Sequence, residues 1–158
     1  MIYSLTIKYA IEACVHLAQI PAGENAHVRE ISREATIPIH FLAKILQQLA
    51  RKGILVSTKG PTGGFSLRYP PEKISLMHVI NAMDALSEYG KSVCGLTECT
   101  DDQVWAAHDG WKEVQARITD YLHRTTIADL ETALAARKRE AGLEQVQPAE
   151  IVARAAGD

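Results

Sequence analysis

The sequence predicts a mainly α-helical fold in which a helix-turn-helix is followed directly by a β-hairpin. Apolar residues recur at helical spacing up to Gly53, and two short β-rich runs then flank the turn Lys59-Gly-Pro-Thr-Gly-Gly. A later amphipathic stretch, from about residue 105, predicts a long C-terminal helix.

The first predicted helix ends before Pro21 and Gly23. Its apolar positions recur every three or four residues and are Ile7, Ala10, Ile11, Cys14, Val15 and Ala18. Cys14 lies on this stripe, and we expect it to be buried, as free cysteines often are.

The next two predicted helices form the helix-turn-helix. A short helix is expected over residues 28–35, and the break Thr36-Ile37-Pro38 follows it. Gly53 is expected to end the second helix in a left-handed conformation. The buried stripe of that helix is Leu42, Ile45, Leu46 and Leu49. Two helices joined by about three residues, the second amphipathic, are typical of a helix-turn-helix.

The apolar period changes after this motif. Residues 54–58 and 65–69 are predicted strands, and the Gly-rich turn between them makes a hairpin. A hairpin directly after a helix-turn-helix indicates a winged helix-turn-helix with a two-stranded β wing. Ser75 suits the N-cap of a further helix over residues 75–86.

The chain divides into four predicted segments. Residues 1–86 are the winged-helix domain, 87–104 a cysteine-containing loop, 105–141 dimerisation helices and 142–158 a frayed tail. A two-fold interface would bury the apolar stripe of the long helix, which is Trp111, Val114, Ile118, Tyr121 and Leu122. Thr126 and Asp129 predict a capping box that begins another helix.

Composition and charge indicate a soluble cytoplasmic protein. The 158 residues contain neither a basic-then-apolar leader nor an apolar run of the roughly 20 residues that span a membrane. Residues 1–70 carry eight Lys/Arg and four Asp/Glu, whereas residues 71–158 carry nine Lys/Arg and fifteen Asp/Glu. Three cysteines in such a protein are expected as thiols, metal ligands or redox groups.

The basic half has a predicted role in binding double-stranded DNA. The second helix of a helix-turn-helix enters the major groove, and its outward residues here are His40, Lys44, Gln47, Gln48 and Arg51. In the wing, glycines allow the backbone to approach a sugar-phosphate surface, and Lys59 can enter the minor groove. The expected wing contacts are Lys59, Gly60, Thr62 and Gly63.

The wing sequence resembles that of a known family. Lys59-Gly-Pro-Thr-Gly-Gly-Phe is similar to the R-G-P-x-G-G-[YF] signature of the Rrf-two winged-helix regulators, which include IscR, NsrR, RirA and CymR. The resemblance spans about residues 1–135 and includes Thr6-Ile-Lys-Tyr-Ala, Ile37-Pro-Ile-His-Phe-Leu, His108-Asp-Gly-Trp111 and Thr126-Ile-Ala-Asp-Leu130. It implies a homodimer held by the long helix and a palindromic operator. Lys59 replaces the usual arginine, and Ala43 replaces a glutamate with which IscR distinguishes operator classes.

The resemblance also implies a sensor loop. Cys94 and Cys99 match the first two of three cysteines that hold an iron–sulfur cluster in family members, and His108 matches a ligand histidine. The third cysteine position is Trp105, which cannot ligate a metal. Glu12 of the partner subunit is a candidate for the remaining ligand. Two alternatives stay open, a reversible Cys94–Cys99 disulfide and a loop without a sensor role.

The sequence therefore predicts a homodimeric DNA-binding transcription regulator, acting as a repressor, that responds to redox or iron–sulfur status. The alternative is a thiol-redox or electron-transfer protein that uses Cys94 and Cys99 without binding DNA. A thioredoxin-like enzyme would carry C-x-x-C, whereas four residues separate these cysteines. A protein–protein module would favour an acidic recognition face, and Lys44, Arg51 and Lys59 argue against it. No nucleophile motif, phosphate loop or paired carboxylates indicate an enzyme.

Overall fold

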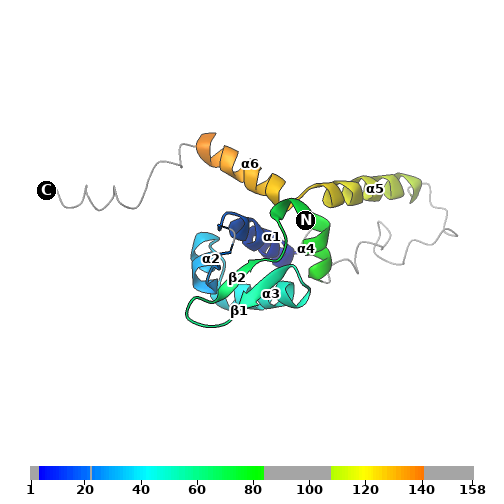
Figure 1. The fold of residues 1–158 in the computed structure, drawn as a ribbon. Helices are drawn as coiled ribbons and strands as arrows, with labels where there is room; N and C mark the ends of the chain where they lie inside the picture. Colours follow the sequence, from blue (N-terminus) through cyan, green and yellow to red (C-terminus); the bar gives the residue numbers. More distant parts are fainter. Residues whose placement is uncertain (1–3, 22, 84–107, 141–158) are drawn as a thin grey trace.

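The structure, a computed structural model, describes residues 4–21, 23–83 and 108–140. Its elements are α1 (Leu5–Ala18), α2 (Val28–Glu34), α3 (Ile39–Arg51), β1 (Leu55–Thr58), β2 (Gly64–Leu67), the 3-10 turn η1 (Pro71–Lys73), α4 (Leu76–Ala82), α5 (His108–Arg124) and α6 (Ile127–Glu140). Helices α1 to α4 and the hairpin form one body, from which α5 projects (Figure 1). The predicted winged helix-turn-helix is confirmed.

The turn of the helix-turn-helix is tight, and a side-chain hydrogen bond holds its backbone. The non-glycine residue Thr36 adopts a φ of 55° there, and the Ser32 hydroxyl donates a hydrogen bond of 2.6 Å to the carbonyl of Ile37. Ile37 is buried and anchors the turn in the core. Gly53 ends α3 with a φ of 78°, as predicted.

The core lies between α1, α3, α4 and the start of β1. Every residue of the predicted α3 stripe is buried in it, and so is Cys14 of α1. The ends of the two last helices contribute Leu122 and Ile127. The periodicity of the apolar residues therefore identified the faces that pack together.

The wing is an antiparallel hairpin, and a single-residue bridge pairs with its outer strand. Leu55 pairs with Leu67 and Thr58 with Gly64. On the outer edge of β2, Ala26 and Phe65 exchange two backbone hydrogen bonds of 2.9 and 3.0 Å. The sequence did not predict this β-bridge, which connects the wing to the segment between α1 and α2.

Two capping boxes fix the later helices. Ser75 and His78 cap α4 reciprocally, and Thr126 and Asp129 cap α6. The sequence predicted the Ser75 cap and the Thr126–Asp129 box, but not the return bond to His78. Hydrogen bonds from the Thr126 backbone and then from its side chain hold the pKa of Asp129 below its usual value. The backbones of the two sites also pair, through hydrogen bonds from Leu76 to Thr125 and from Ile127 to Ile74.

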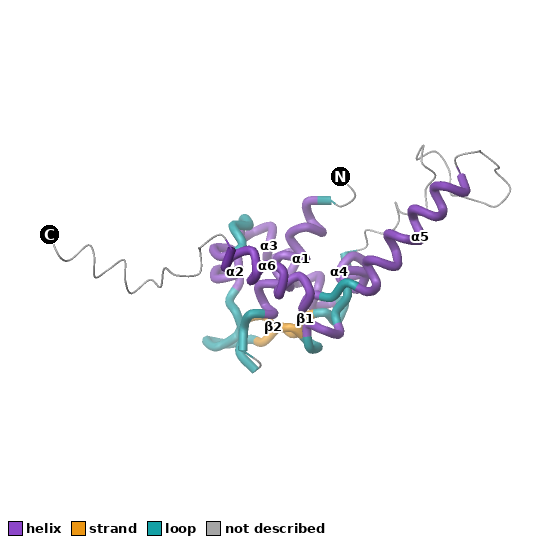
Figure 2. The backbone as a smooth tube through the Cα atoms, turned by 90° about the horizontal axis from the view of Figure 1, so that it is seen from above, coloured by secondary structure: helices purple, strands orange, loops and turns teal. Residues whose placement is uncertain are grey.

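The two last helices diverge from this junction. Helix α6 packs on α1, whereas α5 runs outward beyond α4 in both views (Figure 2). No helix in the described ranges is long and apolar enough to cross a membrane. The predicted loop over residues 87–104, the start of the long helix at 105–107 and the tail over 142–158 lie outside the described residues.

Candidate nucleic-acid interface

The outer face of α3 presents most of the polar side chains that the sequence predicted. Buried Leu42, Leu46 and Leu49 hold the helix against the core, so its opposite side faces solvent. The exposed side chains there are His40, Lys44, Gln47 and Arg51. Their donors and acceptors suit hydrogen bonds to base edges and phosphates.

Gln48 differs from these neighbours. It is half-buried, and its Nε2 donates a hydrogen bond of 3.2 Å to the carbonyl oxygen of Ala82 in α4. Helical spacing puts Gln48 at the edge of the polar face, and α4 covers that edge. The structure therefore places its amide in a tertiary contact with α4, and its contact with DNA stays a prediction.

The wing turn exposes a cation beside open backbone. Lys59, Gly60 and Thr62 are all exposed, and Gly60 has a φ of 109°, which few other residues adopt. A hydrogen bond of 3.0 Å from the Gly63 N–H to the Gly60 carbonyl closes the turn. Asn25 braces it from outside, because its side-chain Nδ2 donates a hydrogen bond of 3.5 Å to the Thr62 carbonyl oxygen.

Gly63 shapes this turn and does not present a contact surface. It is buried, and an added Cβ would overlap the carbonyl oxygen of Thr58 and lie 2.8 Å from that of Gly60. These neighbours are backbone atoms that cannot rotate away. Gly63 therefore closes the turn that carries Lys59, and its own contact with DNA stays a prediction.

The helix and wing share one electrostatic property. Residues 35–71 contain five Lys/Arg and no Asp/Glu. All five cations are exposed, and they are Lys44, Arg51, Lys52, Lys59 and Arg68. The charge counts of the two halves of the chain did not isolate this acid-free segment. A count of charged residues over a window of 37 residues would have found it, together with Arg68. Such a surface attracts a polyanion.

Cys14 is the cysteine that the structure describes, and it is chemically protected. It is fully buried in α1, and burial raises the pKa of its thiol to about 12. The thiolate is the reactive form of cysteine. Cys14 therefore contributes to packing, and any thiol chemistry of this chain falls to Cys94 and Cys99.

We predict that Cys14 makes the protein less stable at high pH. Its pKa is raised from 9.0 in the unfolded chain to about 12, so the folded state retains a proton that the unfolded state loses. The free energy of unfolding should fall from pH 9 toward pH 12, by up to about 1.4 kcal/mol per pH unit. Urea titrations of wild type and Cys14→Ala measure this slope, which the variant should lack. Equal slopes would contradict the prediction.

The predicted sensor residues are only partly within the described chain. His108 is the first residue of α5, whereas Cys94, Cys99 and Trp105 lie outside the described residues. Glu12 lies on α1, where its carboxylate is 3.5 Å from the Lys8 ammonium.

The donor set fits an iron–sulfur cluster incompletely. Two thiols and one imidazole supply three donors, one fewer than the four that such clusters take. Within the ranges described, no group of three or more His, Cys, Asp or Glu is arranged to hold a metal ion. A cluster in this chain would therefore need a ligand from elsewhere.

The apolar stripe of α5 has two sides. Leu122 is buried and Ile118 partly buried, and both pack toward the chain's own core. Val114 and Tyr121 are instead 46% and 57% exposed. They lie two turns apart on one side of the projecting helix. An exposed apolar face of this kind is typical of a protein interface.

A winged helix with a cationic recognition helix and wing defines the class of DNA-binding transcription regulators. Residues 3–133 match the Rrf2 family, described as iron-dependent transcriptional regulators. The chain belongs to this family. It is a helix-turn-helix transcription regulator and not an enzyme, which excludes the redox-enzyme alternative.

Sequence relatives agree with this assignment, and a solved structure shares the fold. A helix-turn-helix-type transcriptional regulator of Aquifex aeolicus is 35% identical over 82% of this chain and 91% of its own length. IscR of Vibrio cholerae is 30% identical over 78% of this chain and 70% of its own length. The structure of CymR, the global cysteine regulator of B. subtilis, superposes with a TM-score of 0.71 at 20% identity, over 83% of this chain and 96% of CymR.

Proposed function

We propose that this chain is a cytoplasmic, homodimeric repressor that binds a palindromic DNA operator with sequence specificity. The observation that carries this proposal is the exposed, acid-free surface of α3 and the wing. His40, Lys44, Gln47 and Arg51 would enter the major groove, and Lys59 with Gly60 and Thr62 would lie on the adjacent backbone or minor groove.

The exposed side of α5 supports the dimer. A second copy related by a two-fold axis would cover Val114 and Tyr121 and place two α3 helices on one face of a duplex. The two α3 helices would then read the two half-sites of a palindrome. The dimer interface would set the spacing between these half-sites. Each α3 contributes sequence readout, and each wing contributes phosphate and groove contacts.

We predict that Lys59→Ala weakens operator binding without unfolding the protein. Lys59 is exposed at the wing turn, so its removal leaves no cavity. The loss of one groove or phosphate contact should cost about 1–3 kcal/mol and lower the salt slope by about one. Fluorescence anisotropy measures both quantities, on a duplex that the wild type selects from a random library.

Two matched variants sharpen this test. Lys59→Arg keeps the charge and should retain most of the affinity. Lys73→Ala removes an exposed lysine from η1, which packs against α6, and should leave binding unchanged. Equal affinities for wild type and Lys59→Ala would contradict the proposed role of the wing.

We propose further that Cys94 and Cys99 set the DNA affinity. The protected Cys14 supports this assignment because it leaves these two thiols to react. A change in their state would shift affinity only if the loop differs in free energy between free and bound forms. Cys94 and Cys99 lie in the sequence between α4, which contacts α3 through Gln48, and the dimer helix α5.

We predict that wild-type operator affinity changes about fivefold or more when the state of these cysteines changes. The measurement titrates operator into wild type and Cys94→Ala/Cys99→Ala under reducing, diamide-treated and iron–sulfide-reconstituted conditions. A shift on reconstitution alone, absent from the variant, assigns the response to an iron–sulfur cluster. A shift with diamide alone, also absent from the variant, assigns it to the thiols. Identical wild-type binding in all three conditions would exclude a sensor role.

A further inference from the structure

A groove lies between α1 and α6, and none of its lining residues belongs to α3, the wing or α5. It encloses about 410 Å³ and is closed at one side by the end of α2. This volume lies within the range of small-molecule sites. The side chains of its apolar wall are Ile11, Val15, Ala35, Leu130 and Leu134. Leu134 is 40% exposed, so nothing in the described chain covers it fully.

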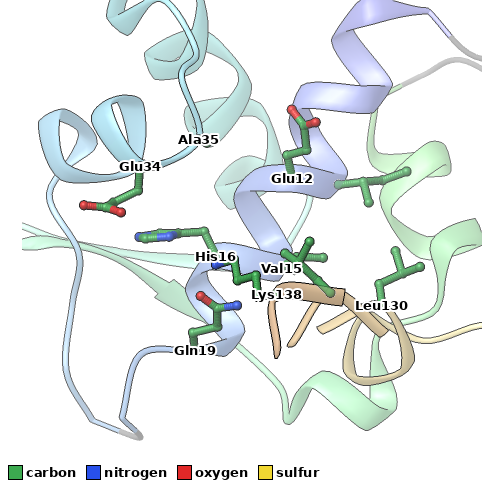
Figure 3. A pocket seen from close by; sticks show the side chains of 10 residues that line it. Glu12, Val15, His16, Gln19, Glu34, Ala35, Leu130 and Lys138 are labelled. Atoms are coloured by element: carbon green, nitrogen blue, oxygen red, sulfur yellow. The ribbon is translucent and has the colours of Figure 1, made fainter. Parts of the chain in front are cut away.

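Polar side chains also line the groove, and they are Glu12, His16, Gln19, Glu34 and Lys138. In Figure 3, Glu34, His16 and Gln19 lie on one side, and Glu12 and Leu130 on the other. The Glu12 carboxylate is already 3.5 Å from the Lys8 ammonium, whereas Glu34 supplies an anion from α2 and Lys138 a cation from α6. The groove therefore presents both signs of charge, beside an amide and an imidazole that are able to form hydrogen bonds.

His16 is half-buried, and one of its ring nitrogens is fully buried. This atom, Nε2, is inaccessible to solvent and makes no hydrogen bond within the described chain. A buried polar atom without a partner is destabilising, so such atoms in native proteins call for an explanation. In Figure 3 the His16 ring is directed toward the side of the groove where Glu34 lies. Because Nε2 has no exposed surface, a ligand head group there would satisfy this nitrogen by displacing the side chains that now cover it.

The Glu34 carboxylate is free to accept a ligand. Its one described ion pair, at 3.6 Å, is with the adjacent Arg33, and the two side chains are 54% and 79% exposed. Pairs of this kind contribute between zero and about 1 kcal/mol. Exchanging Arg33 for a ligand ammonium therefore costs little.

We propose that this groove binds a small zwitterion with an apolar body, the chemistry of an aliphatic α-amino acid. The ammonium group pairs with Glu34 and the carboxylate with Lys138 and the His16 ring. The aliphatic side chain lies against Val15, Leu130 and Leu134. A molecule with only one charge would gain one of these two contacts, whereas a zwitterion gains both, so the pair of charges favours a zwitterion.

The test uses L-leucine as the probe, titrated calorimetrically into the full-length protein. We expect one saturable site per chain, with a Kd below about 1 mM. Two analogues define the head group, because 3-methylbutylamine lacks the carboxylate and 4-methylpentanoate lacks the ammonium. Each analogue should bind at least about tenfold more weakly, having lost one charge-assisted interaction.

Two variants assign each charge to its partner. Lys138→Gln should weaken leucine about tenfold and leave 3-methylbutylamine unchanged, whereas Glu34→Gln should weaken leucine and leave 4-methylpentanoate unchanged. Arg137→Gln, an exposed cation next along α6 that does not line the groove, should bind leucine like the wild type. Melting temperatures confirm that each variant is folded.

Three results would overturn the proposal. One is no saturable heat for leucine up to about 10 mM, well above the expected Kd. Another is equal affinity for leucine and both analogues, which would mean an unselective apolar surface. The last is an equal loss in Arg137→Gln and Lys138→Gln, which would place the effect in the general charge of α6.

Discussion

Val114→Glu is expected to convert the protein from a dimer to a monomer and to weaken operator binding by at least about 100-fold. Val114 is 46% exposed on α5, on the same side as Tyr121 at 57%. A two-fold interface would bring both copies of the new carboxylate into an apolar contact. An unpaired charge buried in this way costs several kcal/mol. The loss of affinity follows because each half-site would then bind separately.

The structure makes Val114 a sharper choice than Ile118. Ile118 lies on the same stripe, but it is partly buried against the chain's own core. A glutamate there would disturb the monomer fold as well as the interface. Val114 makes the distinction possible, because its exposed side chain can be replaced without opening the core.

Ala116→Glu provides the control on the same helix. Ala116 is exposed, and helical spacing places it on the side of α5 opposite Val114 and Tyr121. The Ala116→Glu variant carries the same added charge and should remain a dimer with wild-type operator affinity. Sedimentation velocity gives the oligomeric state, and anisotropy the affinity. A dimeric Val114→Glu would show that the interface lies elsewhere.

Periodicity and capping chemistry made most of the winged helix predictable. The α3 stripe of Leu42, Ile45, Leu46 and Leu49 is buried throughout, because three- and four-residue spacing puts those positions on one face. The cap residues Ser75 and Thr126 were predictable because their bonds are local. Local rules suffice wherever the partner lies within one turn of helix.

Contacts between distant segments were not predictable in this way. The Ala26–Phe65 bridge is one residue long and has no alternating pattern. The pairing of residues 74–76 with 125–127 joins segments that no motif relates. Gln48 belongs to the same class, since periodicity gives its angle on α3 but not that α4 covers it.

The site shows the same division. Exposure of Lys44, Gln47, Arg51 and Lys59 follows from spacing and turn chemistry, and the structure agrees. The α5 stripe was read as one face, yet it divides between the core and an open side, because apolarity does not identify the partner. The α1–α6 groove escaped detection because its walls come from three helices and His16 carries no local signal.

Gly63→Val should disable the wing while leaving the helical body folded. The new Cβ would overlap the carbonyl oxygen of Thr58 and lie 2.9 Å from the carbonyl carbon of Lys59. Since those atoms are backbone, relief requires the turn from Gly60 to Gly63 to open, which displaces Lys59 and Thr62. Operator affinity should fall at least as far as in Lys59→Ala, by about 1–3 kcal/mol.

Ser57→Val controls for the added apolar volume. Ser57 is exposed on β1 and is not among the predicted DNA contacts, so valine there should change affinity by less than about 1 kcal/mol. Circular dichroism should show unchanged helix content in both variants, because both residues lie outside every helix. Wild-type affinity in Gly63→Val would mean that the wing tolerates the side chain.

A double-mutant cycle connects the turn to the cation. If Gly63→Val acts by displacing Lys59, adding Lys59→Ala to it should cost almost nothing further, because the contact is already lost. The salt slope should then be the same in Gly63→Val, in Lys59→Ala and in the double variant, about one below the wild type. Additive losses would instead show that Lys59 keeps its contact when the turn opens. In that case Gly63 would act through the backbone of the wing itself.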